Sequence, residues 1–311
     1  MSSEKLNHDH NSNGDNATEE PEEKSFFKII VHSFFIIPFL IAVFCLLLFA
    51  GMHLLTRENR NAYDYLADVK AGGKDKRWQS AFFISKMKEN ERFQGAFELS
   101  KFLSNPQHVP KEERFYNELE SVFKASRHDD NRVRQYLALA MGRTENKRFT
   151  QVLINGLTDE KEENVAALIY SLGMLRDPEA LDTLYEYLDH ANARIRSVTV
   201  VAIGNIEDSS SRSKLKKALQ DSEANVQWGA AISLANMDDV SGRDILLNLL
   251  NRQYLENYEE VDPEEQTQLI LSAINAAGHL NDKILNERLT EISKNDRNMN
   301  VRSAALKVLE K

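Results

Sequence analysis

The sequence predicts an all-α protein: an α-solenoid, a superhelix of stacked antiparallel helix pairs with a period of about 31 residues, preceded by one transmembrane helix. Gly142, Gly173 and Gly204 are spaced 31 residues apart, and Ala235 continues the series. Two columns of leucine keep the same spacing: Leu153, Leu184, Leu215 and Leu246, and Leu157, Leu188, Leu219 and Leu250. A long apolar run at 29–55 predicts the transmembrane helix.

Residues 1–25 form a polar, acidic segment with seven acids and two lysines, and they contribute −5 of the net charge of −9. Such a segment buries too little apolar surface to offset its ordering entropy, so we predict a disordered tail. The remaining chain lacks the strongly basic balance of nucleic-acid-binding domains, and we expect no nucleic acid partner. The single cysteine, Cys45, excludes a disulfide framework and any Cys-based zinc site.

The run at 29–55 includes 22 residues from Phe34 to Leu55 in which only His53 ionises readily. This length crosses a hydrocarbon core of ~30 Å as a helix. A cleaved signal peptide is the alternative, but its apolar core would be about 7–15 residues long and followed by a small-residue cleavage site. We predict a single-pass membrane location. Lys and Arg counts near the two ends favour a cytoplasmic repeat domain, although long domains weaken this rule and the opposite side stays open.

Residues 56–74 read as a linker or helix, and 75–127 as divergent N-terminal capping helices. The segment 77–88 resembles the first helix of a unit without its glycine, and further helical segments are expected near 91–103 and 111–126. Terminal repeats are expected to be atypical because one of their faces meets water.

Residues 128–311 are predicted to form the repeat array. The first helix of each unit ends at the glycine column, where Gly suits a left-handed C-cap, and a small residue there also allows close helix approach. The second helix carries leucine at i and i+4, the stripe of a packed helix. Between them, Pro178 is expected to begin a helix that Asp177 caps.

The stretch IRSVTVVAIGNI at 195–206 is an apparent exception, because its run of β-branched residues at 198–201 favours a strand. It occupies the same slot as the good helix formers at 136–139, 167–170 and 230–233. The helix penalty of Val or Thr is a few tenths of a kcal/mol per residue. Burying one Val side chain is worth roughly 1.5–3 kcal/mol. We therefore predict a helix, with most side chains of 198–201 buried.

The array becomes irregular after Ala235, because Gly278 follows 43 residues later instead of 31. We assign the extra residues to an acidic, tyrosine-bearing insertion at 251–266. A further unit is expected from Leu269, and 301–310 begins a last, truncated one.

The unit resembles a HEAT repeat, of the short HEAT-like type named after the phycobilisome lyases. The resemblance is carried by Val133-Arg134, Ile195-Arg196 and Val301-Arg302, by Ala-rich first helices, by the glycine column, and by the run 175–180. It covers about 130–311 well and 75–129 poorly. Asn164-Val165 and Val226-Gln227 depart from the pattern because they lack the Arg.

The resemblance implies a scaffold that binds other proteins along one face, but some similar proteins are enzymes or enzyme-maturation factors. Those include bilin lyases and deoxyhypusine hydroxylase, a di-iron enzyme with His-Glu pairs in its repeats. This chain has no His-Glu pair, and its repeat-zone histidines (His128, His190, His279) do not recur in a column. It also lacks phosphate-binding and nucleophile-elbow motifs. We predict no catalytic residue, cofactor or metal site.

The predicted function is a membrane-anchored scaffold that binds a protein partner without catalysis of its own. An enzyme or maturation factor of the lyase or hydroxylase kind, and an accessory subunit of an envelope transport or assembly complex, are the alternatives. Because second helices usually line the concave face of such arrays, we expect the partner there and on the insertion. The predicted contact residues are Gln151, Asp182, Glu186, Lys217, Asp244, Asn248, Tyr254 and Tyr258. Trp78 and Trp228 are expected in the core.

Overall fold

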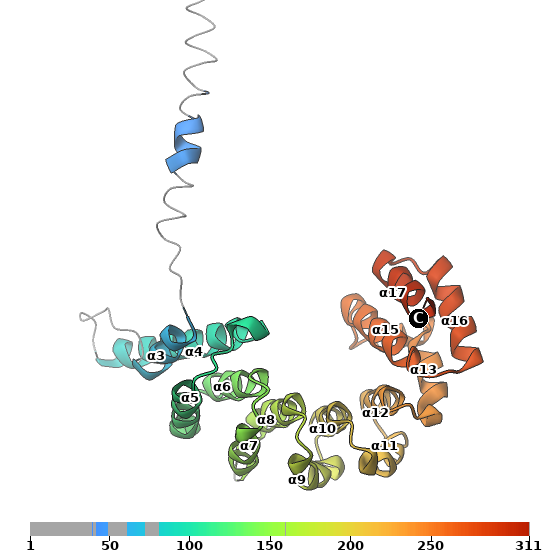
Figure 1. The fold of residues 1–311 in the computed structure, drawn as a ribbon, viewed down its shortest axis with the longest axis horizontal. Coiled ribbons are helices and arrows are strands. Elements are labelled where there is room, and N and C mark those ends of the chain that lie inside the picture. The colour runs from blue at the N-terminus through green and yellow to red at the C-terminus, as the bar shows by residue number, and fades with distance from the viewer. Residues whose placement is uncertain (1–38, 40–41, 49–60, 72–80, 159, 311) are drawn as a thin grey trace, which may run out of the picture. The chain divides into compact units, whose positions relative to one another are not determined.

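The computed structural model describes residues 39, 42–48, 61–71, 81–158 and 160–310. The chain divides into two units, residues 1–59 and 60–311. Nearly all described residues belong to the second unit, which is a succession of α-helices and short 3-10 helices with no β-strand among them (Figure 1). The predicted disordered tail at 1–25 and Trp78 lie outside the described residues.

The predicted transmembrane helix at 29–55 lies mostly outside the described residues, which include only Phe39 and a helical stretch at 42–48 there. Among the helices that the structure describes, none combines the length and the apolar character needed to cross a membrane. α4 (Ala81–Phe102) has 22 residues, about the required length, but it carries several Lys, Arg and Glu residues. The structure thus contradicts the predicted single-pass membrane location, together with the cytoplasmic placement of the repeat domain that depended on it.

Two sets of helices alternate along the second unit, as predicted for helix pairs (Figure 1). The first helices pack against one another in chain order; they are α4, α6 (Asn131–Arg143), α8 (Glu162–Leu175), α10 (Ala193–Ile206), α12 (Ala224–Asn236), α15 (Pro263–Ala277) and α17 (Met299–Leu309). The second helices pack against the first; they are α5 (Glu113–Ala125), α7 (Thr150–Leu157), α9 (Leu181–Glu186), α11 (Arg212–Ala218), α13 (Arg243–Leu249) and α16 (Lys283–Asn295).

The glycine column lies inside the first helices, not after them. Gly142, Gly173 and Gly204 belong to α6, α8 and α10, so they are not the left-handed caps that we predicted. A Cβ atom built on Gly173 would lie 2.6 Å from Cα of Ala202, and one on Gly142 would lie 3.0 Å from Cα of Ser171. Ordinary side chains do not tolerate such contacts, so glycine is needed for the close packing of neighbouring first helices.

The turns after α6, α8, α10 and α12 share a 31-residue pattern of their own. A left-handed residue with φ of 50–59° recurs at Glu145, Arg176, Glu207 and Asp238. The next residue is the N-cap of a 3-10 helix in each unit, and its side chain accepts a bond from the backbone N–H two positions on: Asn146, Asp177, Asp208 and Asp239. Pro178 follows Asp177 at the first helical position, as predicted. Non-glycine residues in the left-handed conformation therefore follow the ends of these four helices.

The leucine columns form the contact between first and second helices. Leu153, Leu184, Leu215 and Leu246 are fully buried. The β-branched stretch lies within α10, which confirms the predicted helix. Thr199 and Val200 are fully buried, whereas Val198 and Val201 are half-buried, so only two of the four side chains reach the core.

The N-terminal part is helical, but its elements differ from those expected. From residue 81 on, where the structure describes them, the segments predicted at 77–88 and 91–103 form one helix, α4. The helix expected near 111–126 is α5, whose buried face includes Phe115 and Phe123. The stretch read as linker or helix at 56–74 contains α3 (Ala62–Ala71), where Tyr63 packs edge-on against Phe115 with ring centroids 5.5 Å apart.

The insertion is shorter than predicted, because α15 begins at Pro263 and not at Leu269. Asp262 caps this helix in a capping box with Glu265, so 263–266 are its first turn. The extra residues are therefore 251–262, which hold the short helix α14 (Arg252–Leu255) and a turn. We call 251–262 the inserted segment below.

Candidate partner-binding surfaces

The predicted contact residues of the second helices are all exposed, and most carry polar contacts only with near neighbours. Gln151 donates to Asn155 at 3.0 Å within α7. Lys217 forms an ion pair with Asp189 at 3.2 Å, and both side chains are largely exposed. Asp182, Glu186, Asp244 and Asn248 are exposed on α9 and α13. We call the exposed surface of α7, α9, α11 and α13 the second-helix face. Its two 31-residue columns are polar throughout: Gln151, Asp182, Ser213 and Asp244, and Asn155, Glu186, Lys217 and Asn248.

Tyr254 and Tyr258, the predicted contact residues of the inserted segment, are half-buried in an aromatic cluster. Both rings pack edge-on against Trp228, with centroids 6.4 and 4.8 Å away. Their hydroxyl groups lie 2.8 Å apart, and Trp228 Nε1 donates to Tyr254 at 3.4 Å. The hydrogen bond with Tyr254, together with burial, raises the pKa of Tyr258 to about 12. Trp228 is buried, as predicted, and the two tyrosines fasten the inserted segment to α12.

The opposite surface, formed by α6, α8, α10 and α12, differs in chemistry, and we call it the first-helix face. Two further 31-residue columns run along it, and their members are apolar or small. One is Leu139, Tyr170, Val201 and Ile232; the other is Tyr136, Ala167, Val198 and Gly229. Most of these side chains are half-buried, and Tyr170 is 42% exposed. Apolar and aromatic residues in the middle of a surface are typical of protein interfaces, whereas isolated polar columns are not.

A groove of about 650 Å³ lies over α8, between α6 and α10. We call it the α8 groove. Tyr136 and Leu139 of α6, Tyr170 of α8 and Val198 of α10 supply its apolar and aromatic lining. Its rim carries charges of both signs from Glu162, Glu163 and Arg194.

A second groove of about 690 Å³ lies over α12, between α10 and α15, and we call it the α12 groove. Val201, Ile232 and Leu269 supply apolar floor, and Gly229 leaves the middle of that floor without a side chain. Asn205, Asn236 and Gln268 line it with amides. The rim carries the carboxylates of Asp262, Glu264 and Glu265, and the described lining residues include no Lys, Arg or His. Both grooves have the volume of ordinary ligand-binding clefts.

Sequence reasoning missed the first-helix face, although its signal is present in the sequence. The column of Leu139, Tyr170, Val201 and Ile232 has the same period as the leucine columns. Apolar residues that recur in this way are first interpreted as core, since exposure cannot be read from type and period alone.

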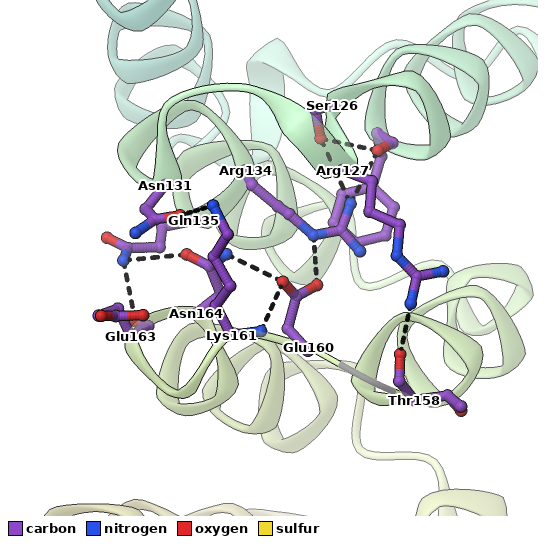
Figure 2. Close-up of polar contacts among 11 residues, drawn as sticks. Ser126, Arg127, Asn131, Arg134, Gln135, Thr158, Glu160, Lys161, Glu163 and Asn164 are labelled. Atoms are coloured by element: carbon purple, nitrogen blue, oxygen red, sulfur yellow. Dashed lines mark hydrogen bonds and ion pairs between the residues drawn. The ribbon is translucent and has the colours of Figure 1, made fainter.

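The arginines that carry the family resemblance are part of the turns that join the units. Arg134 pairs with Glu160, and both side chains are almost fully buried (4% and 2% exposed). Arg134 also donates to the carbonyl oxygen of Phe123 at 3.0 Å, while Glu160 accepts from Asn164 Nδ2 at 3.0 Å. Figure 2 shows this network beside the contact between Arg127 and Thr158. Because Arg134 and Glu160 are buried and bonded to each other and to neighbouring groups, we interpret the pair as stabilising the fold.

The same turn recurs in the third unit with a more accessible pair. Arg196 donates twice to Asp221, at 2.8 Å each, which lowers the pKa of the Asp221 carboxyl and raises that of Arg196. In the next unit Gln227 replaces the arginine and donates to the Asp221 carbonyl oxygen at 2.6 Å. This bond is equivalent to the one that Arg196 donates to the His190 carbonyl oxygen at 2.9 Å, so Gln227 keeps the contact with the turn before its helix and loses the charge.

The described residues hold no group of three or more His, Cys, Asp or Glu side chains placed to bind a metal ion. His190 accepts a bond from the backbone N–H of Asn192 at 3.1 Å, and its ring stacks on Tyr187. His128 and His279 are exposed on turns at other places.

Comparisons with known proteins agree with this architecture. Residues 119–200 and 182–257 match the family described as HEAT repeats, over less than half of the chain. No curated protein matches the sequence. The structure of the complex of CpcE and CpcF of phycocyanin lyase from Nostoc sp. PCC7120 is similar, with a TM-score of 0.51 and 16% identity, over 82% of this chain and 96% of the matched one. At this identity the likeness shows the fold alone.

Human deoxyhypusine hydroxylase matches more loosely, with a TM-score of 0.28 and 15% identity, over 73% of this chain and 99% of that chain. A likeness of this degree carries no argument. The family match and the succession of helices together show that the described residues form an all-helical array with HEAT repeats, consistent with an α-solenoid, as predicted.

Proposed function

We propose that this chain is a helical-repeat scaffold that binds a protein partner on its first-helix face, without catalysis of its own. One observation supports the proposal above all: half-buried apolar side chains recur along this face at the repeat spacing, from Leu139 to Ile232. A band of this kind leaves apolar area in contact with water, and a partner that covers it gains roughly 25 cal/mol for each Å² removed from water.

The second-helix residues predicted from the sequence are the competing contact surface. Their polar side chains already bond to neighbours or face solvent, as in the pairs Gln151–Asn155 and Lys217–Asp189. Exposed ion pairs contribute little to binding or stability. The first-helix face is therefore the better candidate.

Site-directed photo-crosslinking in cells that make the protein compares the two faces. A photoreactive phenylalanine analogue replaces Tyr170 on the first-helix face or, as the matched position, Asp182 on the second-helix face. We expect a discrete crosslinked protein from position 170 and none from position 182. A product from position 182 alone would assign the partner to the second-helix face, and no product from either position would contradict the scaffold function.

An enzyme or maturation factor remains the alternative of a different class, and the similar CpcE–CpcF complex belongs to a phycocyanin lyase. Metal analysis and absorbance spectroscopy of the purified full-length chain separate the two functions. We expect no stoichiometric metal and no bound chromophore. Either one at a 1:1 ratio would overturn the scaffold proposal.

A further inference from the structure

The α12 groove has three features that the packing of the helices does not explain. The first is Gly229, in the middle of α12. Glycine in a helix interior is less stable than alanine by roughly 0.5–1 kcal/mol, so a buried helical glycine needs a reason. Gly142 and Gly173 have one, because a side chain there would clash with the next helix.

Gly229 has no such reason. A Cβ atom built on it would meet its nearest neighbours, Val201 and Val200, at 3.4 and 3.5 Å, which is ordinary van der Waals contact. The equivalent positions one, two and three units earlier hold Val198, Ala167 and Tyr136. The helix therefore accepts a side chain here, and what glycine provides is an open floor in the α12 groove.

The second feature is a set of amides without partners. Asn205 and Asn236 stand one repeat apart, both line the groove, and both are half-buried. Within the described part of the chain, neither side chain takes part in a hydrogen bond. A carboxamide offers both donors and an acceptor, which matches the alternating N–H and C=O groups of an extended backbone.

The third feature is the charge of the rim. Asp262 and Glu265 serve the capping box of α15, but Glu264 takes no part in it beyond its backbone N–H. Within the described residues, none of these carboxylates forms an ion pair. A ligand that bears carboxylates would be repelled from this rim, whereas Lys or Arg side chains would be attracted.

We infer that the α12 groove binds an extended segment of a partner protein that places an apolar side chain over Gly229 and carries Lys or Arg beside it. Asn205 and Asn236 hydrogen-bond the backbone of the segment, and Glu264 attracts its positive charge. The inference rests on the proposed scaffold function and names the class of sequence that one part of the first-helix face recognises.

A random-peptide display selection against the full-length chain tests this inference. We expect the enriched peptides to share an apolar residue with Lys or Arg within a few positions. The enriched peptide of highest affinity is then synthesised with a fluorescent label, and its Kd is measured by anisotropy for wild type and variants. Failure to enrich any peptide, or enrichment of acidic peptides, would overturn the inference.

Gly229→Leu fills the floor of the groove and should weaken binding of the labelled peptide at least tenfold. Ser213→Leu adds the same side chain to the second-helix face and should leave the Kd unchanged. Thermal unfolding establishes whether each variant is folded. An unchanged Kd in folded Gly229→Leu would overturn the inference.

Glu264→Lys provides a second measurement at an exposed residue, where folding is not at risk. It should weaken the same peptide at least threefold at low salt and less at high salt, whereas Asp244→Lys on the second-helix face should not. Equal effects of the two charge reversals would show that attraction to the whole chain, not to the groove, governs binding, and would overturn the inference. Crosslinking at Tyr170, which lies in the α8 groove, judges the scaffold function independently.

Discussion

The first-helix glycines of the regular units, α6 to α11, and of the irregular unit that begins with α12 have opposite roles. In the regular units, glycine removes a side chain so that the next first helix can approach, as Gly173 does against Ala202. In α12, Gly229 removes a side chain beside a gap, because α15 packs less closely on α12 than α8 and α10 pack on each other. The same residue type therefore closes one part of the array and keeps another open.

The two parts also differ in how their turns are held. In the regular part, Arg134 of α6 forms a buried pair with Glu160, which lies between α7 and α8. In the irregular part, Arg252 of the inserted segment reaches Asp296, far along the chain, with bonds of 2.8 and 2.9 Å. Ion pairs therefore join residues 26 apart in the chain where the repeat is regular, and residues 44 apart where the inserted segment interrupts it.

Arg134→Ala is the change with the largest expected effect, because it strands the buried carboxylate of Glu160. Removing one member of a buried ion pair costs about 3–5 kcal/mol of unfolding free energy. Urea denaturation followed by circular dichroism measures the loss. In the control, Arg134→Met combined with Glu160→Leu should recover most of it, since no unpaired charge remains. A loss below about 0.5 kcal/mol, the size of an ordinary surface effect, would contradict the structural role of this pair.

Gly173→Ala adds one methyl group where no space exists. Overpacking of this kind costs typically about 1–3 kcal/mol. We expect the urea midpoint to fall. A neutral or stabilising result would mean that α8 and α10 are not in close contact, and the explanation of the glycine column would fail.

Gly229→Ala makes the same change in the irregular unit, and we expect the opposite sign. The added methyl group meets only ordinary contacts, and alanine is a better helix former than glycine by about 0.5–1 kcal/mol. The urea midpoint should rise by the corresponding amount. A fall similar to that of Gly173→Ala would show that the two glycines do the same work, and the contrast between the two parts would disappear.

Acid sensitivity gives the smallest predicted difference, at Asp239 in the turn after α12. Burial alone would raise the pKa of this carboxyl, but bonds from Lys216 and Ser241 outweigh it and lower the pKa to about 2. Because the folded-state pKa is below the unfolded value of about 3.9, the carboxylate stabilises the fold above that pH and loses its contribution as pH falls towards 2.

Asp239→Asn should therefore be less stable than wild type at pH 6 and should lose less stability between pH 5 and pH 3. Thermal unfolding at the three pH values compares the two proteins. If stability fell equally with pH in both proteins, protonation of Asp239 would not contribute to the acid sensitivity of the fold, which would contradict the prediction.

Much of the architecture follows from the 31-residue period, because a repeated unit must bury the same positions each time. The leucine columns, the cap at Asp177 and the helix at 195–206 were all predictable on that ground. For the glycine column we expected both a left-handed cap and close helix approach, because a glycine near a helix end suits the two equally well. Only the packing of Gly173 on Ala202 distinguishes the two.

The candidate surface was less predictable than the fold. Val201 lies beside Val200 in sequence and has the same chemistry, yet Val200 is fully buried, whereas Val201 is half-buried and lines the α12 groove. From the sequence, Tyr254 and Tyr258 were predicted to contact a partner, but their rings pack on Trp228 of α12. Whether such a side chain is buried or exposed depends on tertiary packing, in which residues distant in sequence contact it.

The bonds that join successive turns span short and similar stretches of chain: Arg134 and Glu160 are 26 residues apart, and Arg196 and Asp221 are 25 apart. Loops of this length cost similar, modest entropy to close, so folding can begin at any unit and extend to its neighbours. The 44 residues between Arg252 and Asp296 interrupt this uniformity. Because closing this longer stretch costs more entropy, we expect the contact at the inserted segment to form after those of the regular units during folding.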